Sequence, residues 1–144
     1  MKNPNLDQIY IFHLEKAYKQ FKKYKNECFK KAGIDITGDQ WILLKNIHEN
    51  EGINQRELAK KSFKEPASIT RILDILERKT WVTRRNAAND RRTYELYTTD
   101  AGKALVVKIL PIAIDIREKG MKDIAEENVT KLSQMLIQIF KNFS

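Results

Sequence analysis

Hydrophobic residues recur along most of this chain at every third or fourth position, the spacing of one face of an α-helix. Residues 7–32 predict a long first helix, with an apolar stripe formed by Tyr10, Leu14, Ala17, Phe21, Tyr24 and Cys28. Phe12, Tyr18 and Phe29 add aromatic surface beside the stripe. One short domain cannot cover this much apolar surface. We therefore expect part of it to contact a second subunit.

Lysines occupy the other sides of this first helix. They are Lys16, Lys19, Lys22, Lys23, Lys25, Lys30 and Lys31. A charged face of this kind is usually solvated, and we expect the same here. The alternative is that some of these lysines contact phosphate groups.

Two short helices are predicted next. Thr37 and Gln40 have the spacing of a capping box, which opens a helix that continues to about Glu49. Within it, Trp41 is expected in the core, or alternatively in the wall of a ligand pocket. A second helix covers residues 55–61 with Leu58 and Ala59 inward, and Asn54 is placed to cap it, with Glu57 as the N3 residue.

A further helix begins near Pro66 and continues to about Lys79. Pro is favoured in a first helical turn because its missing N–H would have no partner there. Ile69, Ile72, Leu73 and Leu76 form one buried stripe, whereas the opposite face is small or polar.

Two segments after this helix are rich in β-branched and aromatic residues and predict a β-hairpin. They are Trp81–Asn86 and Thr93–Tyr97, and they flank a polar tip made of Ala87–Asn89 and the charged triplet Asp90–Arg92. Helix, turn, helix and basic hairpin together form the pattern of a winged helix-turn-helix, a DNA-reading fold.

Two more helices follow the hairpin. Thr99 is expected to cap one that reaches about Gly120, with Pro111 bending it. Residues 106–107 and 109–116 are apolar on more than one face, so we expect that part of the helix to be buried on nearly all sides. A last amphipathic helix covers about residues 125–142.

The chain resembles the MarR family of regulators over roughly residues 10–142. The matching residues are Thr37, Gln40–Trp41, Glu57–Leu58–Ala59, Ser68–Ile69–Thr70–Arg71, Leu76–Glu77, Lys79, Val82, Arg84, Asp90, Arg92, Thr99 and Gly102. Two positions depart from the family pattern: Thr80 stands where Gly is usual, and Thr98 where Leu is usual. Gly is the low-cost residue where a helix ends in a left-handed conformation, so Thr80 bears on the helix exit.

The predicted fold is therefore mainly α: a winged helix-turn-helix domain with long N- and C-terminal helices that form a dimerisation region. We expect a single domain over residues 1–144. Within it, residues 33–99 would form the DNA-binding part, and residues 7–32 and 100–143 the dimerisation helices.

The overall charge fits a polyanionic partner. The chain has 144 residues and a formal net charge of +8, which suits nucleic acid but would also suit a membrane surface. No apolar run approaches the roughly 20 residues of a membrane span, and the first residues do not form a signal peptide. With a single cysteine and no disulfide framework, we expect a cytoplasmic protein without a membrane partner.

Candidate DNA-reading residues lie in the helix that starts at Pro66. An α-helix fits the major groove, and its N-terminal part would present Pro66, Ala67, Ser68, Thr70 and Arg71. Arg71 can contact a guanine with two hydrogen bonds; the alternative is a pair with its helix neighbour Asp74. The start of the preceding helix, Asn54, Gln55 and Arg56, could hold a phosphate.

The hairpin supplies a second set of candidates: Arg84, Arg85, Asn89, Asp90, Arg91 and Arg92. The resemblance points to Arg92 as a residue inserted into the minor groove and braced by Asp90. Arginine suits a narrow A·T-rich groove because negative potential is concentrated there. Arg84, Arg85 and Arg91 would then contact phosphates. The alternative is that Asp90 and Arg92 form only a surface ion pair.

These residues predict a sequence-specific regulator of transcription that binds double-stranded DNA. The resemblance implies a homodimeric repressor on a near-palindromic operator, released by a small-molecule effector. No cofactor is implied, and we expect no enzyme and no metal site. His13 and Cys28 would lie roughly 22 Å apart on one helix, and His48 adds no metal-ligand spacing.

Two other functions stay open. A repressor of the same fold could sense oxidants through Cys28, although a thiol on an apolar stripe is usually inert. A winged helix could alternatively serve protein–protein contact, which the arginines of the hairpin and the net charge argue against.

Overall fold

The computed structural model describes residues 3–144 and is mainly helical, with one small antiparallel sheet, as predicted. The helices are α1 (Tyr10–Lys31), α2 (Gly38–Glu49), α3 (Gln55–Ser62), α4 (Pro66–Arg78), α5 (Asp100–Gly120) and α6 (Glu126–Phe143). The strands are β1 (Ile53–Asn54), β2 (Val82–Ala87) and β3 (Asp90–Thr98), and a 3₁₀ turn covers Leu6–Gln8. The described chain forms two compact units that divide within α5, between Ile112 and Ala113.

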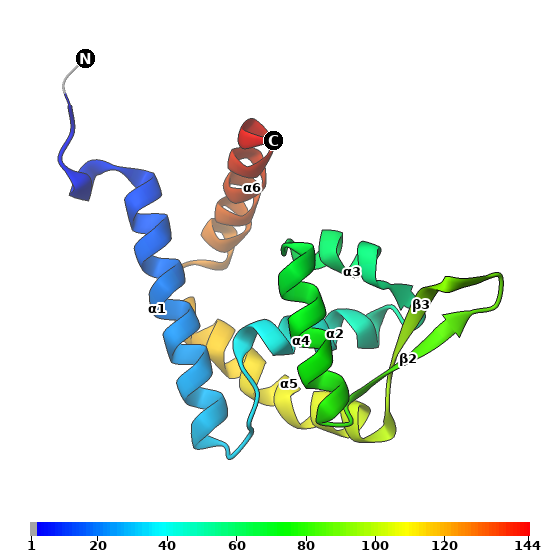
Figure 1. The fold of residues 1–144 in the computed structure, drawn as a ribbon. Helices are drawn as coiled ribbons and strands as arrows, with labels where there is room; N and C mark the ends of the chain where they lie inside the picture. The colour runs from blue at the N-terminus through cyan, green and yellow to red at the C-terminus, as the bar shows by residue number, and fades with distance from the viewer. Residues whose placement is uncertain (1–2) are drawn as a thin grey trace. The chain divides into compact units, whose positions relative to one another are not determined.

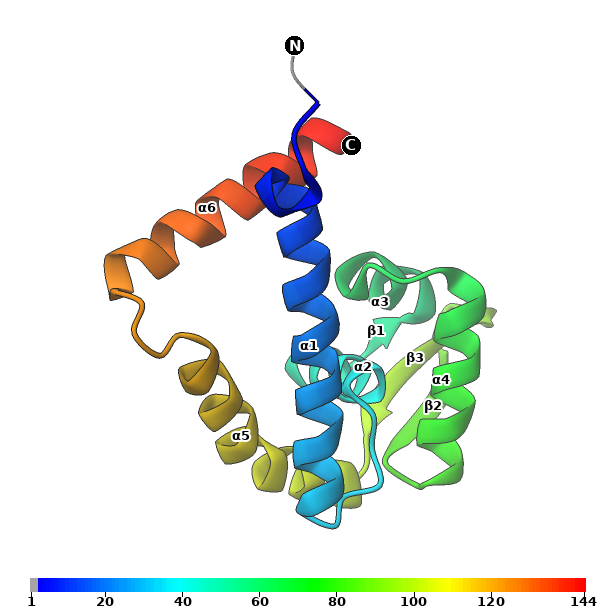
Figure 2. The same cartoon turned by 90° about the vertical axis from the view of Figure 1, so that its left-hand side faces the viewer.

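The first unit is built around α2, which contacts α1, α3, α4 and β3 (Figure 2). Its core combines fully buried residues from every element around α2. They include Phe29, Leu43, Leu44, Ile47, Leu58, Ile69, Leu73, Leu76, Leu96 and Ile109. Three of the four residues predicted to form the buried stripe of α4 are among them, whereas Ile72 is half-buried. Trp41 also lies in the core, as expected.

The helix starts are capped as the sequence predicts. Gln40 N–H donates to Thr37 Oγ1 (3.2 Å), and Thr37 N–H donates to Gln40 Oε1 (3.0 Å), which completes the capping box of α2. Asn54 Oδ1 accepts from the N–H of Glu57 at the start of α3 (2.8 Å). Thr99 Oγ1 accepts from Gly102 N–H at the start of α5 (3.0 Å).

The β2–β3 hairpin extends away from the helices (Figure 1) and is longer than predicted. The strands pair in one register from Val82 opposite Thr98 to Asn86 opposite Tyr94; the register then shifts, and Ala87 pairs with Asp90, so Ala88 and Asn89 form the turn. The expectation that Asp90–Arg92 belongs to the tip was therefore wrong, since this triplet opens strand β3. Asp90 has low strand propensity, but it pairs with Ala87 of β2, whereas residues 91–93 lie at the shift between the two registers.

The prediction for the first helix was wrong at Lys25 and at the start of the helix. Phe29, placed beside the apolar stripe, is fully buried, and Lys25, placed on the solvated face, is only 9% exposed. The stripe residues Tyr10 and Phe21 remain exposed. The C-terminal part of α1 crosses α2 at Gly38, so the α1 residues that face α2 are buried. The helix also starts at Tyr10, after the 3₁₀ turn, and not at residue 7.

The second unit consists of the end of α5 and of α6. Helix α6 is amphipathic, yet none of its residues is buried. Its exposed apolar residues are Leu132, Met135, Leu136, Ile137, Phe140 and Phe143. On α5, Val107 and Ile114 are exposed, whereas Ile109 and Ile116 are buried. The expectation that α5 is buried on nearly all sides is therefore not met within this chain.

The exit of α4 has the left-handed conformation at which the family pattern places Gly. Thr80 has φ +63° and its Oγ1 donates to Lys79 O (2.6 Å). A β-branched residue is rare in this region of backbone space.

We expect Thr80→Gly to raise the free energy of unfolding by about 1 kcal/mol, measured by urea denaturation. Relief of roughly 1–2 kcal/mol of left-handed strain exceeds the roughly 0.4–1 kcal/mol that Gly costs through the unfolded chain. Gly33→Ala is the matched control, since Gly33 has φ +71° with open space around it and the change should be destabilising. Equal or lower stability of Thr80→Gly would show that the threonine is not strained.

Candidate nucleic-acid interface

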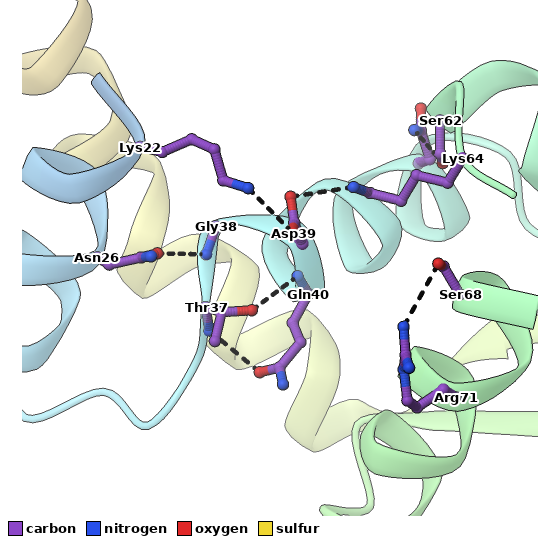
Figure 3. Close-up of polar contacts among 11 residues, drawn as sticks. Lys22, Asn26, Thr37, Gly38, Asp39, Gln40, Ser62, Lys64, Ser68 and Arg71 are labelled. Atoms are coloured by element: carbon purple, nitrogen blue, oxygen red, sulfur yellow. Dashed lines mark hydrogen bonds and ion pairs between the residues drawn. The ribbon is translucent and has the colours of Figure 1, made fainter. Parts of the chain in front are cut away.

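The N-terminal part of α4 presents most of its predicted reading residues to solvent. Pro66, Ala67, Thr70 and Arg71 are exposed, and Ser68 is half-buried. Arg71 Nη2 lies 3.4 Å from Ser68 Oγ, a long contact within the same turn (Figure 3). The alternative partner considered for Arg71, Asp74, pairs with a strand residue instead. The guanidinium of Arg71 therefore lies at the surface of α4 beside the hydroxyl of Ser68.

A direct hydrogen bond links the start of α3 to α4. Gln55 Nε2 donates to Thr70 Oγ1 (2.8 Å), and the Thr70 hydroxyl donates to Pro66 O (3.2 Å). Asn54 uses its side-chain oxygen to cap α3, whereas Arg56 is exposed. Of the three residues predicted at this helix start, Asn54 therefore has a structural role, and Gln55 fixes the two helices of the motif relative to each other.

An open groove of about 570 Å³ lies between α3 and the start of α4. Its lining residues are Gln55, Arg56, Ala59, Lys60, Phe63, Lys64, Glu65 and Pro66. Three of them are cationic and one is anionic. Because Lys64 is paired with Asp39, the groove presents Arg56 and Lys60 against Glu65, a small positive excess that suits a polyanion.

At the start of β3, Asp90 accepts hydrogen bonds from the main chain of Arg92 and from the side chain of Thr93. Its Oδ1 accepts from Arg92 N–H (2.9 Å) and its Oδ2 accepts from Thr93 Oγ1 (3.2 Å). Asn89, Arg91 and Arg92 are all exposed. The carboxylate thus orders the backbone at Arg92, and no ion pair between Asp90 and Arg92 is present in residues 3–144.

The two neighbouring arginines of β2 point to opposite faces of the sheet. Arg85 stacks over the ring of Tyr97, with Cζ 4.5 Å from the ring centre. The Tyr97 hydroxyl donates to Glu95 Oε2 (2.8 Å), and this hydrogen bond raises the pKa of Tyr97. Arg84 lies on the helix-facing side and pairs with Asp74 and Glu77 of α4.

The connection from α3 to α4 is held by a polar cluster around Asp39 (Figure 3). Asp39 pairs with Lys22 of α1 (3.4 Å) and with Lys64 of the connection (3.0 Å). Burial alone would raise the pKa of Asp39, but the hydrogen bonds and charges of Lys64 and Lys22 lower it. Lys25 lies beside Gly38, and its pKa is lowered mainly because it is buried.

This cluster ties the segment that leads into α4 to both α1 and α2. The sequence analysis did not identify Asp39 or Lys64 as residues of the site. The charge pattern alone offers no signal for them, because the three side chains come from separate elements.

The other candidate chemistries find less support. Cys28 is a half-buried thiol in α1. Within residues 3–144, no group of three or more His, Cys, Asp or Glu side chains could hold a metal ion. None of the helices in this part of the chain is long and apolar enough to cross a membrane.

Comparison with protein-family models gives one match, to the MarR family, over residues 36–94. This segment contains α2, α3, α4 and most of the hairpin, and so most of the residues that the sequence predicts to contact DNA. Residues 36–94 are therefore a segment of the MarR-family type.

Several solved structures of DNA-binding proteins share the fold of this chain. The S. aureus MepR–DNA complex matches with a TM-score of 0.86 at 21% identity, covering 94% of this chain and 99% of that one. A mutant of E. coli MarR complexed with operator DNA has a TM-score of 0.84 at 24% identity, covering 95% and 99%. Bordetella bronchiseptica BpsR, whose DNA binding is regulated by 6-hydroxynicotinic acid, has a TM-score of 0.88 at 15% identity, covering 96% and 97%.

Proposed function

We propose that this protein is a sequence-specific repressor that binds a near-palindromic operator in double-stranded DNA as a homodimer. The observation that carries the proposal is the exposed N-terminal turn of α4, where Arg71 and Thr70 face solvent beside a cationic groove. MepR and E. coli MarR, which share this fold, have been solved with DNA.

In the proposed complex, α4 enters the major groove. Arg71 would contact a guanine through its guanidinium, and Ser68 and Thr70 would contact base edges or phosphates. The hydrogen bond from Gln55 to Thr70 supports this arrangement because it keeps α4 in a fixed orientation on α3. Ordered side chains lose less conformational entropy when they bind.

The hairpin would reach the minor groove with Arg92. Its backbone is ordered by the carboxylate of Asp90, so the side chain can enter a narrow groove without rearrangement of the strand. Arg85 and Arg91, together with Arg56 at the start of α3, would contact phosphates and set the register of the protein on DNA.

The dimer proposal is supported by apolar surface that the single chain leaves exposed. It includes Tyr10, Tyr18 and Phe21 on α1 and the apolar side of α6. Large exposed apolar patches are rare on monomers and mark interaction surfaces. A two-fold dimer would present its reading helices about 34 Å apart, one turn of DNA, which is the reason for a near-palindromic site.

Release by a small molecule is the regulatory part of the proposal. An effector would shift the dimer towards a geometry that cannot span both half-sites, by no more than its differential affinity for the two geometries. The regulation of BpsR by 6-hydroxynicotinic acid is a precedent in a protein of the same fold. The oxidant-sensing alternative through Cys28 would instead require a thiol that reacts in the native protein at neutral pH.

We expect Arg71→Ala to weaken binding to the operator by about 5- to 150-fold, which corresponds to about 1–3 kcal/mol for a lost two-bond guanine contact. Fluorescence anisotropy would measure it with DNA from upstream of the protein's own gene and with scrambled DNA, at two salt concentrations. Arg78→Ala is the control, because Arg78 is an exposed arginine at the other end of α4.

The expected pattern is loss of preference for the upstream fragment in Arg71→Ala only. Equal losses in both arginine variants would indicate that α4 contributes charge and not base recognition. Absence of wild-type binding to any DNA at low salt would refute the proposed function and favour protein–protein contact.

A further inference from the structure

Arg84 lies in the basic hairpin, yet its side chain pairs with two carboxylates of α4. Its Nη2 donates to Asp74 Oδ1 (3.0 Å), and its Nε forms an ion pair with Glu77 Oε1. The side chain of Arg84 is only 22% exposed. We propose that Arg84 is a positioning residue that locks the hairpin to α4, and that it does not contact phosphate.

The sheet register explains why Arg84 points towards α4. Arg84 lies directly opposite Leu96, which is fully buried in the core, and residues opposite each other in an antiparallel pair share one face. Arg85 lies opposite Glu95 and therefore belongs to the other face. Of these two adjacent arginines, only Arg85 remains on the solvent side.

The geometry on α4 is equally specific. Asp74 and Glu77 are three residues apart, so their carboxylates project from the same side of the helix. One planar guanidinium reaches both through two of its nitrogens, an arrangement that a lysine could not reproduce. A DNA phosphate that approached Arg84 would have to come close to both carboxylates, which would repel it.

These contacts of Arg84 with Asp74 and Glu77, called the clamp below, join the two parts of the protein that would touch DNA. Helix α4 carries Arg71, and the hairpin carries Arg92 beyond Arg84 on the same ribbon. If the ribbon is fixed to α4 at Arg84, the offset between the major-groove and minor-groove contacts is fixed as well. This inference rests on the proposed function for its effect on DNA binding, but the clamp itself exists without DNA.

The two possible roles of Arg84 predict opposite results for its partners. If Arg84 is a positioning residue, Asp74→Asn combined with Glu77→Gln should weaken operator binding about tenfold, although the change makes the protein more positive. If Arg84 contacts phosphate, the same change should free it and leave binding equal or tighter. Glu65→Gln, which removes an exposed carboxylate beside the reading helix, controls for the gain in charge.

The salt dependence of binding separates the roles a second time. For Arg84→Ala we expect about tenfold weaker operator binding with the wild-type salt slope on scrambled DNA, and for Arg84→Lys partial rescue. Combining Arg84→Ala with the Asp74 and Glu77 changes should add little, because all three act through one clamp. A salt slope reduced by about 1 in Arg84→Ala would assign the residue to a phosphate and overturn the inference.

Amide hydrogen exchange tests the clamp without DNA. We expect faster exchange in β2 and β3 in Arg84→Ala and in the Asp74 and Glu77 double variant, with wild-type exchange in α2. Unchanged exchange in the hairpin would overturn the inference even if DNA binding were altered. If wild-type protein bound no DNA while the hairpin loosened as expected, the clamp would stand and the proposed function would fail.

Discussion

Replacing Phe29 by alanine is expected to lower the free energy of unfolding by about 3–5 kcal/mol, the range for truncating a buried aromatic side chain. Phe29 is completely buried where the end of α1 meets the rest of its compact unit. Truncation removes the apolar contacts of the ring and leaves a cavity that the surrounding core cannot fill completely. Urea denaturation followed by circular dichroism would measure the change.

Phe63→Ala is the control for this experiment. Phe63 is 79% exposed, so its truncation should change stability by no more than about 1 kcal/mol. Comparable losses in both variants would mean that the end of α1 is not packed as the structure has it.

Gly102→Ala is expected to destabilise the protein by about 3 kcal/mol, at the upper end of the range for overpacking. A Cβ at Gly102 would lie 2.1 Å from the carbonyl oxygen of Trp81. That atom belongs to the main chain just before β2, and the same Trp81 oxygen accepts a hydrogen bond from Thr99 N–H (3.1 Å). The backbone can therefore yield only if the start of α5 moves away from the hairpin.

Gly120→Ala provides the matched control on the same helix. No atom lies within 4 Å of the position that its Cβ would occupy. Alanine is a better helix former than glycine, so this change should be neutral or stabilising by up to about 1 kcal/mol. A neutral Gly102→Ala would show that α5 does not approach the hairpin as closely as the structure indicates.

The clamp at Arg84 and the cluster at Asp39 give the reading helix two fixed supports in the chain. Asp39 ties the segment before α4 to α1 and α2, and Arg84 ties α4 to the hairpin. Regulation that alters DNA binding would have to move α4 together with these supports or break one of them. Variants at Asp39 and Arg84 would therefore separate changes in helix orientation from changes in hairpin orientation.

Local patterns were enough to predict most of the helices and their caps. Apolar stripes and helix caps act within one or two helical turns, so they can be predicted from the sequence. Examples are the stripe of Ile69, Leu73 and Leu76 and the capping residues Thr37 and Asn54. The exposed residues at the start of α4 follow from the same pattern, since the side opposite a buried stripe faces solvent.

Partners far apart in the chain were not predictable in this way. The sequence suggested that Arg84 contacts phosphate and that Lys25 is solvated, because both lie in strongly basic segments. Arg84 instead faces α4, since its strand position shares a face with Leu96. Lys25 is buried because α1 crosses α2 at the glycine that begins that helix.

The sequence by itself determined the fold class, the order of the elements and which side of α4 faces solvent, because periodicity and capping are local properties of the chain. The tertiary structure decided that Arg85 of the hairpin is exposed to solvent and that Arg84 is held by carboxylates. It also decided the length of the hairpin and the burial of Lys25. These features depend on strand register and helix crossing, which bring together residues that no local pattern connects.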